Sequence, residues 1–185
     1  MNTDSRRDAV TQITETPLPA AALLQRYAGQ WEGGAVVPYT DSFSVCVDGE
    51  ISLSEFVGAF YTTWLFRIER WILAIVLRQQ STDQQARLLG DGTIKEFAAW
   101  RVELRTDTQL LLCDLESRTR SWLMVEADEN RSSAQPMTRL WFGSAVVPAP
   151  NRKTGQMELG RVFKWLLGFH RWYSKALLAA SVKNL

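Results

Sequence analysis

Two polar residues in otherwise apolar surroundings, His170 and Asp114, are the best candidates for chemistry. His170 is the only histidine of the chain, and an imidazole titrates near neutrality, so it can act as an acid, a base or a donor to a ligand. Asp114 interrupts the apolar run Gln109–Leu115, where a buried carboxylate needs a partner such as Arg120 or His170. An Asp114–His170 pair would serve acid/base catalysis. Both residues also have structural interpretations, a hydrogen-bonded core histidine and a strand end in water.

Other reactive groups point away from covalent or metal chemistry. The sequence has no G-x-S-x-G nucleophile elbow to accompany His170. Ser117 and Thr119 are predicted to be turn residues. The two cysteines, Cys46 and Cys113, form no C-x-x-C pair, which excludes a standard zinc site or a redox dithiol. We therefore expect no metal and no cofactor, and both thiols reduced.

Aromatic side chains form a second candidate set, because the chain has eight tryptophans, and aromatic residues are common in cores, interfaces and ligand cavities. Trp100 shares its predicted strand face with Val102 and Leu104. Plain core packing is the alternative for each aromatic residue. If the fold contains a cavity, the residues predicted to line it are Trp64, Trp100, Asp114, Trp122, Phe163, Leu166, His170 and Tyr173.

Length and charge limit the class of protein. With 185 residues, 46% of them hydrophobic, the chain can form one core without disulfides or metals. Its net charge of +1 gives no electrostatic basis for binding nucleic acid. Residues 1–16 are polar and lack the apolar region of a signal peptide. We expect a flexible tail over 1–16, a single domain over 17–185, and a cytoplasmic protein.

The C-terminal stretch Met157–Leu185 is predicted to be a long one-sided helix, because apolar side chains recur at helical spacing and the stretch contains no proline. His170 lies near the centre of the apolar stripe. The opposite side carries basic residues flanked by tryptophans, which is typical either of a solvated helix face or of a surface that contacts anionic lipid. These residues are Arg161, Lys164, Trp165, Arg171, Trp172 and Lys175.

The rest of the chain predicts a sheet for that helix to pack on. Tyr39–Val47 alternates as a strand, with Tyr39, Asp41, Phe43, Val45 and Val47 on one face. A capping box at Ser52 and Glu55 starts a helical region that breaks near Phe66–Arg70 and resumes over Trp71–Leu77. A polar linker over Gln79–Gln85 leads to a meander of strands, Ile94–Arg105, Gln109–Leu115, Arg120–Ala127 and Met137–Val147. This order predicts an α+β fold, a curved antiparallel sheet gripping a long C-terminal helix, with two helices inserted after the first strand.

That order of elements resembles the helix-grip fold of the START-like (SRPBCC) superfamily over about residues 39–183. The phrases FAAWRVELRTDTQLLLCDLESRTRSWLMVE, RLWFGSAVV and GFHRWYSKALL are similar to an uncharacterised bacterial branch of that superfamily, a domain of unknown function. The resemblance implies a cavity between the sheet and the C-terminal helix that takes a hydrophobic ligand. It implies no shared catalytic motif.

Three functional hypotheses follow. The first is a binding module for a small hydrophobic or aromatic molecule in the cavity. The second is a cyclase, dehydratase or hydrolase that uses the same cavity with His170 as the acid or base. The third is an interaction or peripheral membrane protein that uses exposed tryptophans and the basic helix face. A closed core would exclude the first two, and an exposed apolar patch would favour the third. The sequence does not predict an oligomeric state.

Overall fold

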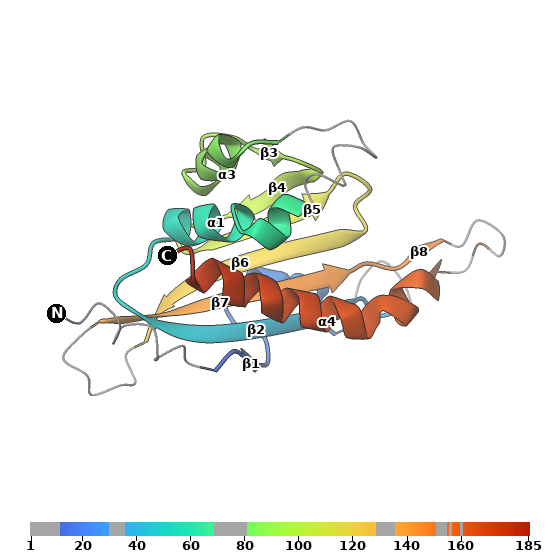
Figure 1. Cartoon of the computed structure of the whole chain (residues 1–185). Coiled ribbons are helices and arrows are strands. Elements are labelled where there is room, and N and C mark those ends of the chain that lie inside the picture. The colour runs from blue at the N-terminus through green and yellow to red at the C-terminus, as the bar shows by residue number, and fades with distance from the viewer. Residues whose placement is uncertain are drawn as a thin grey trace.

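A seven-stranded antiparallel sheet in the order β1-β2-β7-β6-β5-β4-β3 organises the chain (Figure 1). The computed structural model describes residues 12–29, 36–68, 81–128, 136–150, 155, 157–159 and 161–185, and over 161–170 it describes the backbone alone. The predicted helix Trp71–Leu77 lies outside the described residues. The α+β class predicted from the sequence is confirmed.

The elements follow one another in a simple chain order. The strands of the sheet are β1 (Thr14–Glu15), β2 (Tyr39–Asp48), β3 (Glu96–Phe97), β4 (Trp100–Arg105), β5 (Gln109–Asp114), β6 (Thr119–Ala127) and β7 (Met137–Val146). A separate hairpin pairs β8 (Ala149–Pro150) with β9 (Met157–Glu158). The helices are η1 (Leu23–Tyr27), a short 3-10 helix, α1 (Leu53–Tyr61), α3 (Asp83–Gly90) and α4 (Arg161–Val182), and residues 64–68 are also helical.

Strand β2 lies between the N-terminal strand β1 and the last long strand of the sheet, β7. It pairs with β7 along its whole length, from Tyr39 opposite Val146 to Asp48 opposite Met137. Strands β3 to β7 form the predicted meander, each paired with the next. Because β2 lies beside the last strand of the meander, α1 and α4 come to cover the same face of the sheet (Figure 1).

Helices α1 and α3 both begin at capping boxes. The hydroxyl of Ser52 accepts a hydrogen bond from the backbone N of Glu55 at 3.2 Å, and the Glu55 carboxylate accepts one from the backbone N of Ser52 at 2.8 Å, as the sequence predicts. Thr82 and Gln85 make the same pair of bonds before α3. Helix α3 therefore begins at Asp83, inside the segment Gln79–Gln85 that the sequence predicts to be a linker.

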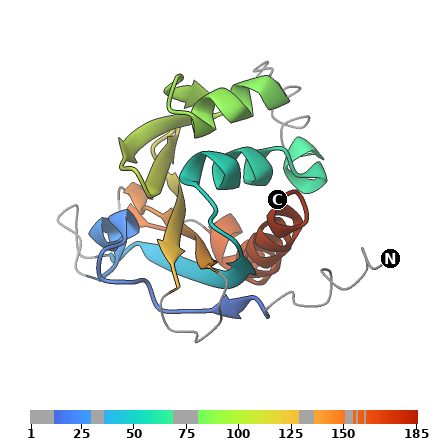
Figure 2. The same ribbon diagram turned by 90° about the vertical axis from the view of Figure 1, so that its left-hand side faces the viewer.

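The sheet buries an apolar core on each face, because successive side chains of a strand point to opposite sides. The larger core lies between the sheet and α1, α3 and α4, and it includes Phe43, Leu123 and Phe142. The smaller core lies on the other face, where Leu24 of η1 packs with Trp122 and Trp141. Figure 2 shows η1 on one side of the sheet and α1 and α4 on the other.

The N-terminal segment joins the sheet earlier than the sequence suggests. Thr14 and Glu15, inside the predicted tail 1–16, pair with Ser44 and Phe43 as strand β1. After it, residues Leu23–Tyr27 form the short 3-10 helix η1.

Two predicted boundaries also change. The single strand expected over Ile94–Arg105 is two strands, separated by a turn in which Ala98 has a φ of 53°. The C-terminal helix begins at Arg161 because residues 157–158, the start of the predicted helix, form β9.

A β-bulge in β4 changes which side chains share a face. The register with β5 shifts between Val102 and Leu104, so Val102 pairs with Leu112 and Leu104 with Leu111. A bulge inserts one extra residue and reverses the alternation beyond it. Leu104 is therefore 36% exposed and does not share the face of Trp100, which corrects the face predicted for it.

The two cysteines are free thiols, as expected from the sequence. Cys46 lies on β2 and Cys113 on β5, with β7 and β6 between these strands. Neighbouring strands lie about 4.8 Å apart, so the two cysteines are separated by roughly 14 Å. A disulfide needs Cα atoms within about 7 Å, so the fold keeps these thiols apart.

Candidate functional site

A pocket of about 550 Å³ lies on the helix-covered face of the sheet. Its described wall comes from the end of α1, the helical residues 64–68, the start of β6, the end of β7 and the described half of α4. Pockets of about 300–1,000 Å³ with mostly apolar walls are typical of small-molecule sites. The pocket therefore lies between the sheet and the C-terminal helix, where the sequence predicts a cavity.

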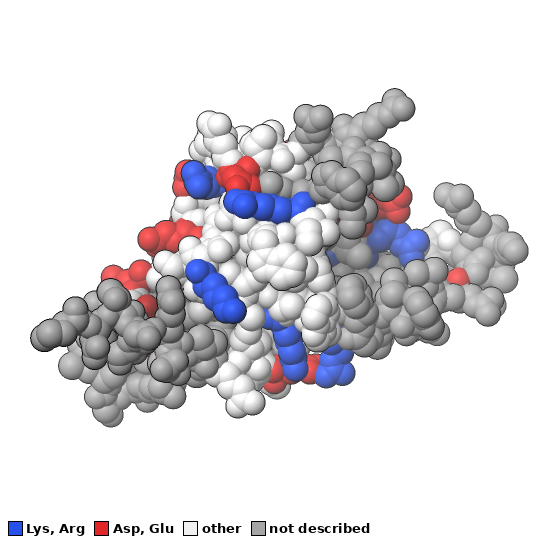
Figure 3. All heavy atoms as spheres, viewed as in Figure 1, with Lys and Arg blue, Asp and Glu red and all other residues white. Residues whose placement is uncertain are grey.

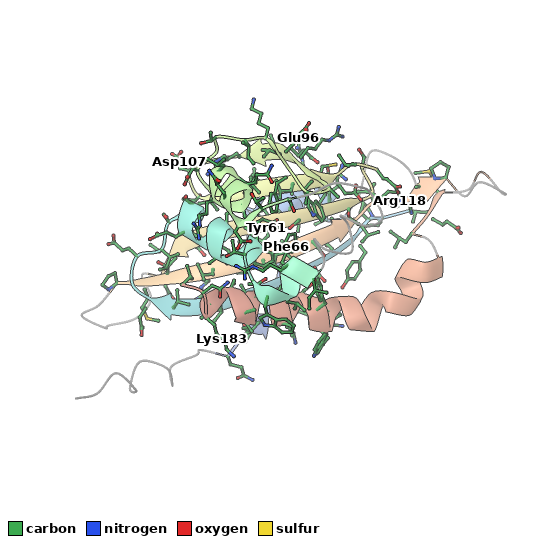
Figure 4. The ribbon with its side chains drawn as sticks, turned by 45° about the horizontal axis from the view of Figure 1, so that its top comes forward. Tyr61, Phe66, Glu96, Asp107, Arg118 and Lys183 are labelled. Carbon is green, nitrogen blue, oxygen red and sulfur yellow. The ribbon has the colours of Figure 1, made fainter. Side chains whose placement is uncertain are left out.

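Aromatic rings fix the wall formed by α1. The ring of Phe60 lies 4.7 Å from that of Phe142 on β7, and the ring of Tyr61 lies 4.8 Å from that of Phe66. Phe66 stacks on Phe97 of β3 with ring centroids 6.2 Å apart. Tyr61 and Phe66, labelled in Figure 4, lie where α1 passes into residues 64–68 above the sheet. These contacts hold the apolar wall in place through both the sheet and the helix.

Helix α4 supplies the opposite wall and is anchored at several points. Tyr173, Ser174 and Leu177 line the pocket. The ammonium group of Lys175 lies 5.5 Å from the centre of the Phe43 ring, and Arg171 forms an ion pair with Glu15 of β1. The pocket is therefore bounded by a helix that is tied to the sheet.

A buried carboxylate lies beside the sheet end of the pocket. Asp41 on β2 is opposite Ser144 on β7, and its Oδ1 accepts hydrogen bonds from the Ser144 backbone N at 3.1 Å and hydroxyl at 2.6 Å. The Tyr39 hydroxyl donates to Asp41 Oδ2 at 3.3 Å. Burial, followed by the negative charge of Asp41, raises the pKa of Tyr39 above its ordinary value. Tyr39 therefore stays protonated and acts as a donor.

A second polar pair joins the pocket residue Ser121 to the core residue Tyr61. The hydroxyls of Tyr61 and Ser121 lie 2.9 Å apart and hydrogen-bond each other. Both residues are buried, Tyr61 in the larger core and Ser121 on β6. This bond uses the Tyr61 donor or the Ser121 donor inside the protein, so neither group is an isolated polar atom in the apolar wall.

Two residues of the pocket lining, Trp100 and Ser174, each carry a buried polar atom without a partner. Among the described residues, Trp100 Nε1 and Ser174 Oγ are inaccessible to water and make no hydrogen bond, and Ser81 Oγ is the only other buried side-chain oxygen or nitrogen in that condition. Ser174 is 1% exposed. Native proteins rarely leave buried polar groups unsatisfied, but both atoms lie behind the accessible surface of the pocket.

The only charged residue of the described pocket lining, Arg120, is neutralised by Glu103. Its Nε lies 2.6 Å from the Glu103 carboxylate and 2.9 Å from the Tyr27 hydroxyl, and its Nη1 donates to the backbone oxygen of Ser117 at 2.9 Å. Burial alone would lower the pKa of Arg120, but the nearby Glu103 raises it. The guanidinium therefore stays charged, and it bonds to groups on the opposite face of the sheet.

On the outer surface, Figure 3 shows uncharged atoms at the centre of the face that carries α4, with Lys and Arg around them.

The structure brings together only some of the residues predicted to line a cavity. Trp100 and Tyr173 line the pocket. Trp64 does not, because it is 66% exposed on the outer side of the helical residues 64–68. Trp122 lies in the smaller core on the opposite face of the sheet, where its Nε1 donates to Gln109 Oε1 at 2.9 Å.

Asp114 has a structural role in the β5–β6 turn. It accepts hydrogen bonds from the backbone N of Arg118 at 2.7 Å and from the Thr119 hydroxyl at 2.8 Å, and it is absent from the pocket lining. Its predicted partner Arg120 pairs with Glu103 instead. The alternative interpretation of Asp114, a polar residue at a strand end, is the one that fits.

The side chains predicted for the first half of the helix remain predictions. The backbone of residues 161–170 is helical, but the side chains of Phe163, Leu166 and His170 lie outside the described part of the structure. The Asp114–His170 pair is therefore still a hypothesis from the sequence.

Sequence reasoning missed the small polar residues of the pocket. Ser121, Ser144 and Ser174 line it, and Thr119, predicted as a turn residue, is the first residue of β6 and lines it too. Ser117, by contrast, is in the turn as predicted, with a φ of 58°. A signal did exist, because Ser121 and Ser144 interrupt strand faces that are otherwise apolar.

The described residues contain no cluster of three or more His, Cys, Asp or Glu side chains that could hold a metal ion. Within the same residues, no helix has both the length and the hydropathy required to cross a bilayer. Comparison of the chain with protein-family models, curated proteins and solved structures finds no significant match. Its function must therefore be argued from its own residues.

Proposed function

We propose that this protein binds a small, largely apolar molecule in the pocket between the sheet and helices α1 and α4. The observation that carries the proposal is the apolar pocket of about 550 Å³ itself, walled by Phe60, Phe66, Phe142 and Leu177. Burying apolar ligand surface contributes about 25 cal/mol per Å² removed from water. A ligand of modest size can therefore bind through burial alone.

We propose further that the fold is a helix-grip fold of the START-like type, with a curved sheet around α4. This proposal is supported by the placement of α4 on the face of the sheet and by the helices between β2 and the meander. In such a fold the cavity between sheet and helix is the ligand site, which agrees with the proposed function. A cytoplasmic location is also proposed, and the two free thiols support it.

Filling the pocket tests the proposed function. Val146 lines the pocket at the end of β7 and is 5% exposed, so Val146→Phe adds a bulky ring to the wall. Val37 is 48% exposed and lies outside the described lining, so Val37→Phe is the matched control. Nile red, an uncharged apolar dye, serves as the probe in a fluorescence titration. We expect Val146→Phe to weaken dye binding at least tenfold and Val37→Phe to leave it unchanged. Equal affinity in wild type and Val146→Phe would refute this site.

A second candidate function, contact with a lipid surface, is supported by exposed apolar side chains near the pocket. Trp64, Ile68 and Trp172 are 66%, 47% and 61% exposed, and the latter two also line the pocket. Exposed tryptophans beside basic residues favour the interface of an anionic membrane. Flotation with phosphatidylglycerol vesicles tests this: wild type should float, and the double variant Trp64→Ala, Trp172→Ala should not. If the wild-type protein remains at the bottom of the gradient and does not float with the vesicles, this candidate function fails.

A further inference from the structure

A row of polar side chains crosses the apolar floor of the pocket on three neighbouring strands. Ser121 on β6 is directly opposite Ser144 on β7, and Ser144 is directly opposite Asp41 on β2. Residues opposite each other on antiparallel strands point to the same face of the sheet. On that face Leu123 and Phe142, two residues away along β6 and β7, belong to the larger core under the helices. The polar row therefore faces the helices that cover the pocket.

Ser121 and Ser144 both belong to the pocket wall and lie close to each other. They line the pocket and keep 6% and 5% of their surface accessible. The Cβ atoms of a directly opposite pair are about 4.5–5.5 Å apart. A hydrogen bond between two oxygens is about 2.8 Å long, so one ligand oxygen between the two serines can reach both hydroxyls.

The hydrogen bonds that the two serines already make decide what they can offer a ligand. The Ser144 hydroxyl donates its proton to Asp41 Oδ1 at 2.6 Å, so in any further bond to a ligand this hydroxyl acts as the acceptor. The Ser121 hydroxyl bonds to the Tyr61 hydroxyl at 2.9 Å, which is its one side-chain bond within the described residues. A hydroxyl has one donor and two acceptor sites. When Tyr61 donates in that bond, the proton of Ser121 is available to a ligand.

A ligand hydroxyl meets both of these requirements at once. It can donate its proton to Ser144 and accept a proton from Ser121. A ketone oxygen can only accept, so it would bring a second acceptor against the Ser144 oxygen. A carboxylate has the same defect, and it would add a second negative charge to the row that contains the buried carboxylate of Asp41.

We propose that the ligand is an uncharged, mainly apolar alcohol, whose hydroxyl bonds to Ser121 and Ser144 at the floor of the pocket. The inference rests on the proposed function, because it needs the pocket to bind an apolar molecule. It adds an orientation, with the hydroxyl against the sheet and the apolar part against the walls that include Phe66 and Leu177. Each hydrogen bond to an uncharged ligand is worth roughly fivefold in affinity.

Three probes that differ in one substituent test which group the pocket selects. They are 1-(2-naphthyl)ethanol, 2-acetylnaphthalene and 2-isopropylnaphthalene, which carry a hydroxyl, a carbonyl oxygen and a methyl group at the same position. The anionic probe is 2-naphthoate. Equilibrium dialysis with the full chain measures each affinity. We expect the alcohol to bind roughly fivefold or more tightly than the ketone, and 2-naphthoate to bind most weakly.

Two variants that each lack one hydroxyl should respond differently. Ser144→Ala removes the acceptor that only the alcohol uses, so the alcohol and the ketone should bind this variant equally well. Ser121→Ala removes the donor that both oxygens use, so both affinities should fall roughly fivefold and their ratio should persist. The affinity for 2-isopropylnaphthalene should change little in either variant, which shows that the pocket is intact. The control is Ser181→Ala, outside the pocket lining, whose hydroxyl donates to the Leu178 backbone oxygen, and it should bind all probes like wild type.

The outcomes separate this inference from the proposed function. If the alcohol and the ketone bind wild type equally well, or if the ketone or 2-naphthoate binds most tightly, the alcohol inference is wrong, while binding of 2-isopropylnaphthalene still supports an apolar pocket. An alcohol preference that persists in Ser144→Ala would overturn it, because the hydroxyl would then bond elsewhere. Unchanged affinity of Ser121→Ala for both oxygen-containing probes would overturn it as well. If no probe binds, this inference and the proposed function both fail.

Discussion

Asp41 and Ser144 face each other across strands β2 and β7, and a single carboxylate oxygen of Asp41 accepts both the backbone N–H and the hydroxyl of Ser144. Both residues are buried, at 6% and 5% exposure. This bond ties the first long strand to the last one beside the pocket. The carboxylate could not be buried there without such donors, because an unpaired buried charge is costly.

Ser144→Ala is therefore expected to lower the free energy of unfolding by about 1–3 kcal/mol, the cost of removing a donor from a buried carboxylate. Urea unfolding followed by circular dichroism measures the change. Ser181→Ala is the control, because its hydroxyl bonds to a neutral carbonyl within α4 and alanine favours the helix. A loss no larger for Ser144→Ala than for Ser181→Ala would show that this bond does not stabilise the sheet.

Two glycines are expected to respond to alanine with opposite signs. A Cβ at Gly143 on β7 would lie 2.7 Å from the Asp41 backbone oxygen and 2.9 Å from the Trp122 ring. A Cβ at Gly58 in α1 would have the Arg87 side chain as its nearest neighbour, at 3.9 Å. Gly143→Ala should destabilise the protein by about 1–3 kcal/mol through overpacking. Gly58→Ala should stabilise it by about 0.5–1 kcal/mol, because alanine is the better helix residue.

Thermal unfolding of both glycine variants beside wild type provides the measurement. Both expected effects depend on the close approach of β2 and β7 and on the space beside α1. Unfolding of Gly143→Ala at or above the wild-type temperature, or of Gly58→Ala well below it, would contradict these expectations.

Trp64 and Trp122, which were both predicted to line a cavity, should differ strongly in their contribution to stability. Trp122 is completely buried and bonded to Gln109, whereas Trp64 is 66% exposed. Trp122→Ala should cost about 3–5 kcal/mol, as for other large-to-small changes in a core. Trp64→Ala should stay within about 0.5 kcal/mol of wild type. Denaturant melts of the two variants test this, and similar losses in both would place Trp122 outside the core.

Tyr39 makes the stability of the fold sensitive to alkaline pH. Burial and the charge of Asp41 raise the pKa of Tyr39 above its unfolded value of 10.0. Below pH ~10 both states hold the proton, and the stabilisation is fully present. Above that pH the unfolded state loses the proton first, so the free energy of unfolding falls by at most about 1.4 kcal/mol per pH unit from this group.

Urea unfolding at pH 8 to 11 measures this slope. Tyr39→Phe removes the titrating group, so the variant should lose stability less steeply than wild type above pH ~10. Identical slopes for the two proteins in that range would mean that Tyr39 ionises as easily in the folded state as in the unfolded chain.

The alternation of Tyr39–Val47, the Ser52 capping box and the meander could be predicted because each depends on local spacing or local turn chemistry. The turn at Ala98 could not, since alanine is not a turn signal and adopts a positive φ only where the surrounding sheet imposes it. The bulge before Leu104 is likewise set by pairing with β5. A bulge reverses the side-chain pattern without marking the sequence.

For a related reason, only some of the residues predicted to line a cavity lie in the pocket. The sheet is buried on both faces, so the alternation of β6 shows that Ser121 and Trp122 point to opposite sides but not which side meets the helices. Trp122 was therefore placed in the cavity, whereas Ser121 lines it. Ser174 was overlooked because a single serine in an amphipathic helix carries no signal until its surroundings are known.

The indole N–H resonance of Trp100 provides the most direct test of ligand binding in the pocket. In a ¹⁵N-labelled sample, this resonance is assigned by its absence in Trp100→Phe, and the apolar dye Nile red is then added. If the dye occupies the pocket, the Trp100 signal shifts because this residue lines the pocket, while that of the exposed Trp64 stays in place. An unchanged Trp100 signal at saturating ligand, or a shift confined to Trp64, would contradict the account.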